Sequence, residues 1–454
     1  MILLAACLAQ FMTVLDVSVV NVALPAIQDA LGFGDSGLTW VANGYSLAFG
    51  GCLLLGGRCA DLFGHRRVFL AGVAVFGAAS LLAGAAPGPG WLVAARVLQG
   101  LGGAVLSPAT LAIVTTTFTG ERARRSALGT WSAVGAVGGA AGGLLGGALV
   151  RWAGWRWIFL INVPIALAIG VIAVLFLART GGARERPRLD VVGAALATGA
   201  LVSLVYGATR LQDGGAAYLP FLLAIGLFAA FVRTERRSAA PLVPPGTLLR
   251  RPGLTINLTM AVLGCVAFTT WYFGALFLQR VAGLDAWHTG LAFLPQAACI
   301  IAGARLAGRL PGRIPPKRIV LAGTVCVVAG LGWYSTVDAG SAALTGVVPP
   351  GMLVTFGLGL SFGPLAALAT GAAAEGDTGL AAGLLSTFRQ IGAALGLAGL
   401  AWVAHARSSG LTASGTPAAA AEAAGFGRAF LVAAVLAAAA TALAAAIPGG
   451  ERRG

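Results

Sequence analysis

The sequence predicts an all-α polytopic membrane protein, and three observations support this fold class. Of the 454 residues, 58% are hydrophobic and only 10% are charged, and the mean hydropathy is +0.89. A soluble protein of this length needs far more charge on its surface. Apolar stretches recur at about 20 residues, the length that spans about 30 Å of hydrocarbon. The sequence lacks the short alternating segments of a transmembrane barrel.

Windows of about 19 residues predict fourteen transmembrane helices. The first begins almost at Met1 without a basic leading region, so we expect a retained helix and not a cleaved signal peptide. The predicted helices cover residues 2–26, 38–57, 68–86, 91–115, 126–150, 157–178, 190–209, 218–233, 253–279, 289–308, 318–336, 346–371, 379–404 and 427–447.

The distribution of basic residues predicts the orientation in the membrane. The loops after helices two, four, six, eight and ten, with the C-terminal tail, hold 22 of the 30 Lys and Arg residues. The positive-inside rule places these loops in the cytoplasm. An even number of helices then places both termini there, in a bacterial cytoplasmic membrane. Because the loops account for the net charge of +15, we expect no nucleic-acid partner.

A weak internal repeat predicts the domain organisation. The segment "GRCADLFGHR", residues 57–66, aligns without gaps with "ARLAGRLPGR", residues 304–313. Each follows a predicted helix and opens a basic loop. Parallel repeats of this kind indicate two similar bundles around a central path. We therefore predict an N-terminal six-helix bundle at 1–179, an inserted helix pair with its linker at 180–249, and a C-terminal six-helix bundle at 250–454.

Asp16 is the acid that we expect deepest in a membrane helix, within "LDVSVVNVALP". A charged Asp at a helix centre costs about 2.5–3.5 kcal/mol, so it must be protonated, paired or in contact with water. Arg96 enters the fourth helix near its outer end and could reach a similar depth. Burial favours a neutral carboxyl whereas a nearby arginine favours a carboxylate, so the two residues suit proton coupling. A static structural pair is the alternative interpretation.

Glycines dominate the fifth predicted helix, in "GGAAGGLLGG". Gly138, Gly142 and Gly146 recur every four residues, followed by Gly147. This spacing lets two helix backbones approach closely. A phosphate-binding loop would need a preceding strand and a suitably placed lysine, so we expect helix packing. A role as a pivot between moving bundles stays open.

Charged residues also gather at the cytoplasmic end of the second predicted helix. Asp61 precedes Arg66 and Arg67, and together they could form a latch that breaks when the protein opens to the other side. The alternative is an ordinary acid at the membrane interface. Gly308 occupies the aligned position in the second half, so any latch should be asymmetric.

The substrate pocket is predicted from large or polar side chains in helices that would border the central path. Stacking and shape tolerance suit bulky apolar substrates. Aromatic side chains in membrane helices also face lipid or the core, and Arg389 could instead hold helices together through backbone carbonyls. The candidate pocket residues are Asn21, Tyr45, Gln99, Trp131, Trp271, Tyr272, Phe362, Phe388 and Arg389.

Several motifs resemble one transporter family. "GRCADLFGHRR" resembles the loop signature of the major facilitator superfamily, and "RVLQGLGGA" resembles its fourth-helix motif R-x-x-Q-G. "GGAAGGLLGG" is similar to the fifth-helix motif of antiporters, with Gly143 in place of a proline. "LDVSVVNVALP", "GWRWIFLINVPI", "LAFLPQA" and "STFRQIGAALG" are similar to the fourteen-helix drug:proton antiporter group. The resemblance covers nearly the whole chain.

The resemblance implies two six-helix bundles with two inserted central helices, and a proton-coupled exporter of drugs, dyes or toxic metabolites. An importer or facilitator with the same fold is the alternative. The sequence has no nucleophile–base constellation and no Cys/His cluster, so we expect neither an enzyme, a metal site nor a cofactor. The expected partners are a small-molecule substrate, protons and the bilayer, with the protein acting as a monomer.

Overall fold

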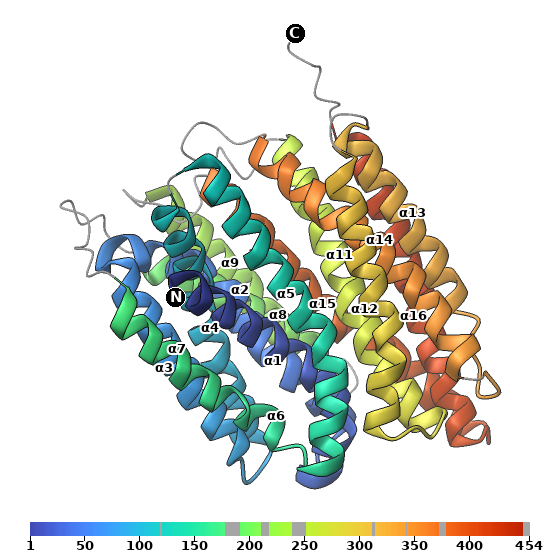
Figure 1. The fold of residues 1–454 in the computed structure, drawn as a ribbon. Coiled ribbons are helices and arrows are strands. Elements are labelled where there is room, and N and C mark those ends of the chain that lie inside the picture. The colour runs from blue at the N-terminus through green and yellow to red at the C-terminus, as the bar shows by residue number, and fades with distance from the viewer. Residues whose placement is uncertain are drawn as a thin grey trace. The chain divides into compact units, whose positions relative to one another are not determined.

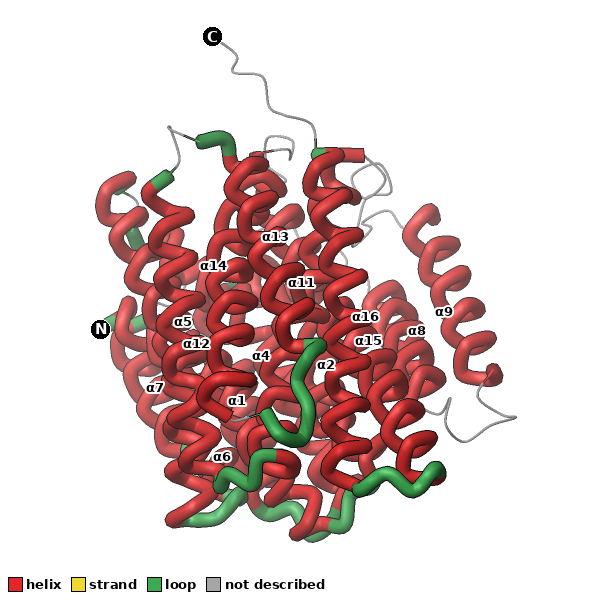
Figure 2. Tube along the Cα trace, turned by 90° about the vertical axis from the view of Figure 1, so that its right-hand side faces the viewer, coloured by secondary structure: helices red, strands yellow, loops and turns green. Residues whose placement is uncertain are grey.

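The computed structural model describes residues 1–118, 120–177, 191–209, 218–237, 251–310, 314–341, 343–371 and 378–447. This part of the chain consists of helices and short connections and contains no strand (Figure 1, Figure 2). The helices up to residue 177 are α1 (Ile2–Leu31), α2 (Asp35–Phe63), α3 (His65–Gly84), α4 (Pro89–Thr117), α5 (Glu121–Trp152), α6 (Trp157–Leu160) and α7 (Asn162–Phe176).

The remaining described helices lie between residues 191 and 446. They are α8 (Val191–Thr209), α9 (Tyr218–Arg237), α11 (Arg251–Leu276) with the π-helical turn η2 (Phe277–Val281), α12 (Ala286–Arg309), α13 (Pro316–Tyr334), the π-helical turn η3 (Ala343–Val347) with α14 (Val348–Gly371), α15 (Thr378–Ala413) and α16 (Ala418–Ala446). Every predicted membrane segment overlaps one of these helices, which confirms the all-α fold class.

Eleven helices in the described residues are long and apolar enough to cross a membrane. The other predicted segments coincide with α2, α5 and α8, so the count of fourteen spans stays a prediction. Several helices are longer than predicted: α1 continues to Leu31 and α15 to Ala413. A hydropathy window stops where the side chains become polar, whereas backbone hydrogen bonding continues until a residue ends the helix. Gly32, with φ of 70°, ends α1 in this way.

The sequence predicts a single helix for the sixth span, at residues 157–178, whereas the structure has two helices there. The short α6 ends at Leu160, and α7 begins at Asn162. Pro164 explains the interruption, because proline has no N–H to donate to the carbonyl four residues earlier. The interruption places Asn162 in the first turn of α7.

The chain divides into two compact units. Unit 1 contains Met1–Ser203, Leu222–Leu242 and Asp285–Leu291; unit 2 contains Leu204–Phe221, Val243–Leu284 and Ala292–Gly454. The division predicted from the sequence repeat, at 179 and 249, stays a prediction.

Helix pairing repeats between the two units. In unit 1, α1 packs on α5, and α3 packs on α4 and α7. In unit 2, α11 packs on α15, and α13 packs on α14 and α16. The same order of helices thus forms the same pairs twice, as expected for a parallel repeat.

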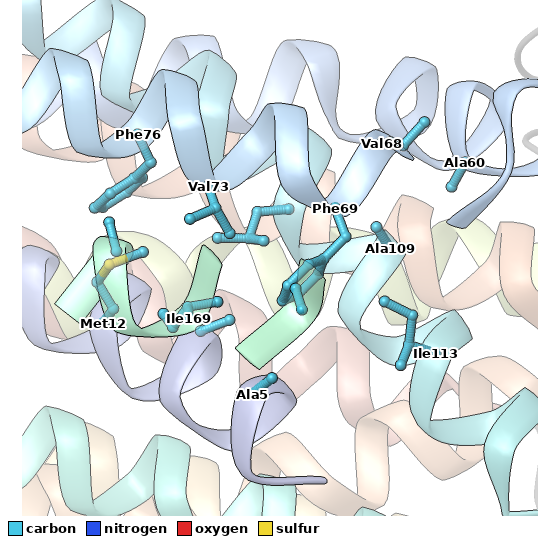
Figure 3. Packing of buried hydrophobic residues seen from close by; sticks show 14 of the residues in the cluster. Ala5, Met12, Ala60, Val68, Phe69, Val73, Phe76, Ala109, Ile113 and Ile169 are labelled. Carbon is cyan, nitrogen blue, oxygen red and sulfur yellow. The ribbon is translucent and has the colours of Figure 1, made fainter. Parts of the chain in front are cut away.

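A continuous apolar cluster forms the core of unit 1. Figure 3 shows Phe69, Val73 and Phe76 of α3 with Met12 of α1 and Ile169 of α7. All five side chains are buried. The cluster fixes α3 and α7 beside the middle of α1.

Glycines bring α5 into backbone contact with α1. A Cβ at Gly138 would lie 3.0 Å from the carbonyl oxygen of Phe11, and one at Gly146 would lie 2.9 Å from that of Val19. A Cβ at Gly142 would collide with Ser18, whose hydroxyl donates to the carbonyl of Gly139 at 2.7 Å. Gly147 differs, because its neighbour is Ala286 at the start of α12, also in unit 1.

Asp285 fixes the start of α12. Its Oδ1 accepts the backbone N–H of His288 at 2.8 Å, which makes it the N-cap of the helix, and its Oδ2 pairs with Arg151 of α5. The hydrogen bond from the His288 backbone is the main cause that lowers the pKa of Asp285 below its ordinary value of 3.8; the His288 side chain and Arg151 add to it, against an opposing effect of burial.

Replacing Gly142 by Ala should destabilise the protein by about 1–3 kcal/mol, because the added methyl overfills the contact with Ser18. Gly170→Ala is the matched control, since a Cβ there meets nothing within 4 Å. That variant should be neutral or gain up to about 1 kcal/mol from helix propensity. Thermal unfolding of the two purified variants measures both effects. Equal melting temperatures would contradict close packing at Gly142.

Asp285→Asn should lower the melting temperature near neutral pH but not in strong acid. A carboxyl whose folded pKa is depressed stabilises the fold above the ordinary value of 3.8, and this stabilisation is lost as pH falls through the folded value. The difference between wild type and variant should therefore be constant from about pH 8 to about pH 5 and shrink below about pH 4. Asp29→Asn, at an exposed position, controls for the loss of one charge. A difference that grows in acid would exclude this role.

Candidate functional site

Asp16 lies on α1 with its side chain completely buried, at 0% exposure. Its neighbours on the same face of α1, such as Met12 and Val19, are equally buried. A carboxyl in this position has no access to water, so its hydrogen bonds must come from the protein. Three side chains supply them.

Arg96 of α4 is the charged partner. Its Nη1 lies 2.5 Å from Asp16 Oδ2, and its Nε donates to the carbonyl of Val41 on α2 at 2.8 Å. The guanidinium carbon lies 4.7 Å from the ring centroid of Tyr45 and 5.7 Å from that of Phe159. Arg96 is 1% exposed, so the aromatic faces and the carbonyl replace the water that a guanidinium would otherwise bind.

Two amides complete the shell of the carboxylate. Gln99, one turn after Arg96, accepts from Arg96 Nη1 at 2.9 Å and donates to Asp16 Oδ1 at 3.1 Å. Its Nε2 also donates to the hydroxyl of Ser80 at 2.8 Å. Asn162 of α7 donates to Asp16 Oδ1 at 2.9 Å. Asp16 therefore accepts from one cation and two amides, an arrangement that suits the carboxylate.

This network, formed by Asp16, Arg96, Gln99, Asn162 and Ser80, is strongly interdependent. Removing one partner of a buried ion pair costs about 3–5 kcal/mol, because the other charge is left without compensation. The pair is also neutral as a whole, which is how a bundle core can hold a charge that would be costly alone.

Several predicted pocket residues lie at or near this network. Gln99 belongs to the Asp16 shell, and Tyr45 covers Arg96 and stacks on Phe49. Asn21 lies further along α1, where its amide donates to the carbonyl of Val17 in its own helix. These three side chains are buried, and their contribution to a substrate pocket stays a prediction.

The other predicted pocket residues are distributed over both units. Trp131 of α5 packs against the small apolar cluster of Ala6, Val114 and Ala127 in unit 1. In unit 2, the ring centroids of Trp271 and Phe293 are 5.2 Å apart. Those of Tyr272 and Phe273 are 5.3 Å apart, and these two rings meet edge to face. Tyr272 is buried, and the other five are half-buried: Trp131, Trp271, Phe362, Phe388 and Arg389. The backbone of Arg389 packs against Gly264 on α11.

The cytoplasmic latch is only partly described. Asp61 lies in α2, and its side chain falls outside the described residues. Arg66 donates to the carbonyl of Val174 at 2.7 Å, near the C-terminal end of α7, where a cation is favoured by the helix dipole. Arg67 is exposed. A latch formed by the three residues stays a prediction.

Sequence reasoning missed two members of the network and one buried acid. Asn162 lies within "GWRWIFLINVPI", and a polar residue inside an apolar stretch was the available signal. Ser80 gave no comparable signal, because serine is common in membrane helices and satisfies itself through the backbone, here the carbonyl of Phe76. Glu235 is 5% exposed at the end of α9, although the sequence placed it in a loop.

The buried charges are unevenly distributed between the units. Among the described residues, unit 1 buries Asp16, Arg96 and Glu235, whereas unit 2 buries only uncharged polar side chains, such as Gln296 and Gln390. The networks of the two units therefore differ in chemistry although their helices pair alike.

Comparison with known proteins identifies the family. Residues 6–397 match the Major Facilitator Superfamily. The cephamycin export protein of Amycolatopsis lactamdurans is 42% identical over 90% of this chain and 85% of its own length. The puromycin resistance protein of Streptomyces alboniger is 39% identical, with 86% and 78% covered.

A solved structure shows the same fold at low identity. The bacterial homologue of the human lysosomal transporter Spinster, in an inward-facing and unoccupied conformation, superimposes with a TM-score of 0.68. The two sequences are 17% identical, and the match covers 98% of this chain and 95% of the other. These findings confirm the resemblance seen in the motifs. The chain belongs to the Major Facilitator Superfamily of membrane transporters.

Proposed function

We propose that this transporter exports amphipathic drugs or toxic metabolites across the bacterial cytoplasmic membrane in exchange for protons. The observation that carries the proposal is the buried Asp16–Arg96 pair, an ionisable couple with 0% and 1% exposure in the middle of a transporter bundle. Ionisable residues inside membrane proteins commonly mark ion or proton pathways. The functions for which its relatives are named, cephamycin export and puromycin resistance, support export of bulky antibiotics.

The network explains how one carboxyl can drive a conformational change. When Asp16 takes up a proton, the ion pair loses its attraction. Arg96 still has the carbonyl of Val41, the amide oxygen of Gln99 and the face of Tyr45 as partners. Opening the pair therefore does not leave the guanidinium without partners, so a ligand or proton can favour a second arrangement of the network.

Alternating access would then couple this exchange to substrate movement. Each protonation state of Asp16 would favour one direction of opening. We place the basic loops and both termini in the cytoplasm, following the positive-inside rule. The predicted pocket residues, among them Trp271 and Phe388, are the proposed contacts for an apolar, ring-containing substrate.

Asp16→Asn should abolish proton-driven transport and leave the protein folded. A gradient of one pH unit corresponds to about 1.4 kcal/mol per proton, or a tenfold accumulation ratio. In proteoliposomes with this gradient, the ratio for puromycin or a fluorescent dye should fall from about ten to about one. Asp29→Asn, the same exchange at an exposed site of α1, should keep the wild-type ratio. Full accumulation by Asp16→Asn would show that Asp16 is structural.

The direction of transport separates export from import. In inverted membrane vesicles, an exporter accumulates the dye in the lumen when the lumen is acidic. An importer would remove the dye from the lumen, and a facilitator would bring its concentrations inside and outside to the same value. Accumulation in right-side-out vesicles alone would therefore contradict export.

A double-mutant cycle tests whether Asp16 and Arg96 act as one unit. Arg96→Gln alone removes the cation beside the buried carboxylate and should destabilise by about 3–5 kcal/mol. In the double variant Asp16→Asn with Arg96→Gln, no charge is left uncompensated, so about 1–3 kcal/mol should be recovered relative to the sum of the single effects. Thermal unfolding of the four proteins measures the coupling. Strictly additive effects would exclude a direct interaction.

A further inference from the structure

Asn162 has an unusual hydrogen-bond pattern within the Asp16 network. Its side chain is 0% exposed, and Nδ2 donates to Asp16 Oδ1 at 2.9 Å. Its Oδ1 is buried too, yet has no hydrogen-bond partner among the described residues. Leaving a buried carbonyl oxygen unpaired is unfavourable, so such a group needs an explanation.

The spare acceptor of Asn162 matches what a protonated Asp16 would require. A carboxylate only accepts hydrogen bonds, whereas a neutral carboxyl also carries one O–H donor. An amide that turns by half a revolution about its last bond exchanges its N–H donors for its oxygen acceptor. The same side chain can therefore bond to either protonation state of Asp16.

The other neighbours of Asp16 cannot take this role. Arg96 has only donors. Gln99 already uses its oxygen for Arg96 and its nitrogen for Asp16 and Ser80. Ser80 accepts from Gln99 and donates to the carbonyl of Phe76.

Few other groups around Asp16 could titrate in the part of the chain that the structure describes. There, the charged or titratable groups that face Asp16 are Arg96 on α4 and, across the guanidinium, Tyr45 on α2. From α5, Gly138 and Gly142 pack on this part of α1, and α6 contributes Phe159.

We infer that Asn162 is a positioning residue whose amide serves both protonation states of Asp16, as donor to the carboxylate and, after turning, as acceptor for the neutral carboxyl. The proton adds to Asp16 Oδ1 to form an O–H bond, which is donated to Asn162 Oδ1; no other covalent bond changes. Release reverses both steps. The inference rests on the proposed proton coupling at Asp16.

The inference predicts a specific pattern for Asn162→Leu, which keeps a similar volume but has neither donor nor acceptor. Both protonation states lose one hydrogen bond, so the midpoint of the transport pH profile should stay within about 0.3 pH unit of wild type. The turnover number should fall about tenfold or more, because Asp16 takes up and releases its proton without the acceptor oxygen of Asn162. The KM for the dye should be unchanged.

A fixed donor predicts a different result. If the amide never turned, only the carboxylate would lose a bond, and the midpoint would move upward by about one pH unit or more. That shift, or a wild-type turnover number, would overturn the inference. Asn257→Leu is the matched control, because Asn257 is also buried with an unpartnered Oδ1 but lies in unit 2. It should leave the midpoint and turnover number unchanged.

Infrared difference spectroscopy gives a second measurement that does not depend on transport. In wild type, protonating Asp16 should shift the amide carbonyl band of isotope-labelled asparagine, and the shift should be absent in both Asn162→Leu and Asp16→Asn. Asn162→Ser, whose hydroxyl can donate or accept, should restore part of the turnover; this variant decides the matter if Asn162→Leu does not fold. An unshifted band in wild type would refute the turning amide.

Failure of the inference and failure of the proposed function give different results. If Asp16→Asn keeps proton-driven accumulation, the proposed function fails, and the inference fails with it. If Asp16→Asn loses accumulation while Asn162→Leu shifts the midpoint upward, proton coupling holds and only the turning amide is refuted.

Discussion

A charge pair at the centre of an apolar bundle constrains everything around it, because neither Asp16 nor Arg96 has water as an alternative partner. The carbonyl of Val41, the amide of Gln99 and the amide of Asn162 must therefore all lie at the level of this pair along the helix axes. These groups come from α2, α4 and α7, so satisfying one carboxylate on α1 fixes the register of four helices. The apolar cluster beside them then fills the space that this register leaves.

Close backbone packing makes the arrangement possible. The glycines of α5 let α1 approach without side chains in between, and a similar contact joins α15 to α11 at Gly392 and Ala261. Interfaces of small residues suit helices in a membrane, where hydrophobicity alone does not drive association. Because contacts of this kind depend on shape more than on long side chains, they also leave fewer interdigitated groups to separate when helices move.

Composition, hydropathy and motifs predicted the fold class, the positions of the helices and the family. Membrane helices can be recognised in a sequence because they are long, continuous apolar stretches. The sequence also singled out Asp16 and Arg96, because charges are rare at such depth. It did not reveal that Gln99 belongs to their shell, because a hydrogen-bond network depends on the rotation of each helix. The interruption before Asn162 could not be predicted from hydropathy, because it depends on the backbone hydrogen bond that Pro164 cannot donate. The ends of helices beyond the hydrocarbon were missed because their polar residues give no hydropathy signal.

The absence of buried charge from the described part of unit 2 has a consequence for how this transporter can change over time. If energy conversion is confined to one half of a duplicated molecule, the opposite half is released from the strict demands that an intramembrane ion pair imposes. Mutations in that half can change the substrate preference gradually, without disturbing the residues that couple transport to protons. Laboratory evolution toward new antibiotics should accordingly accumulate its tolerated changes on that half.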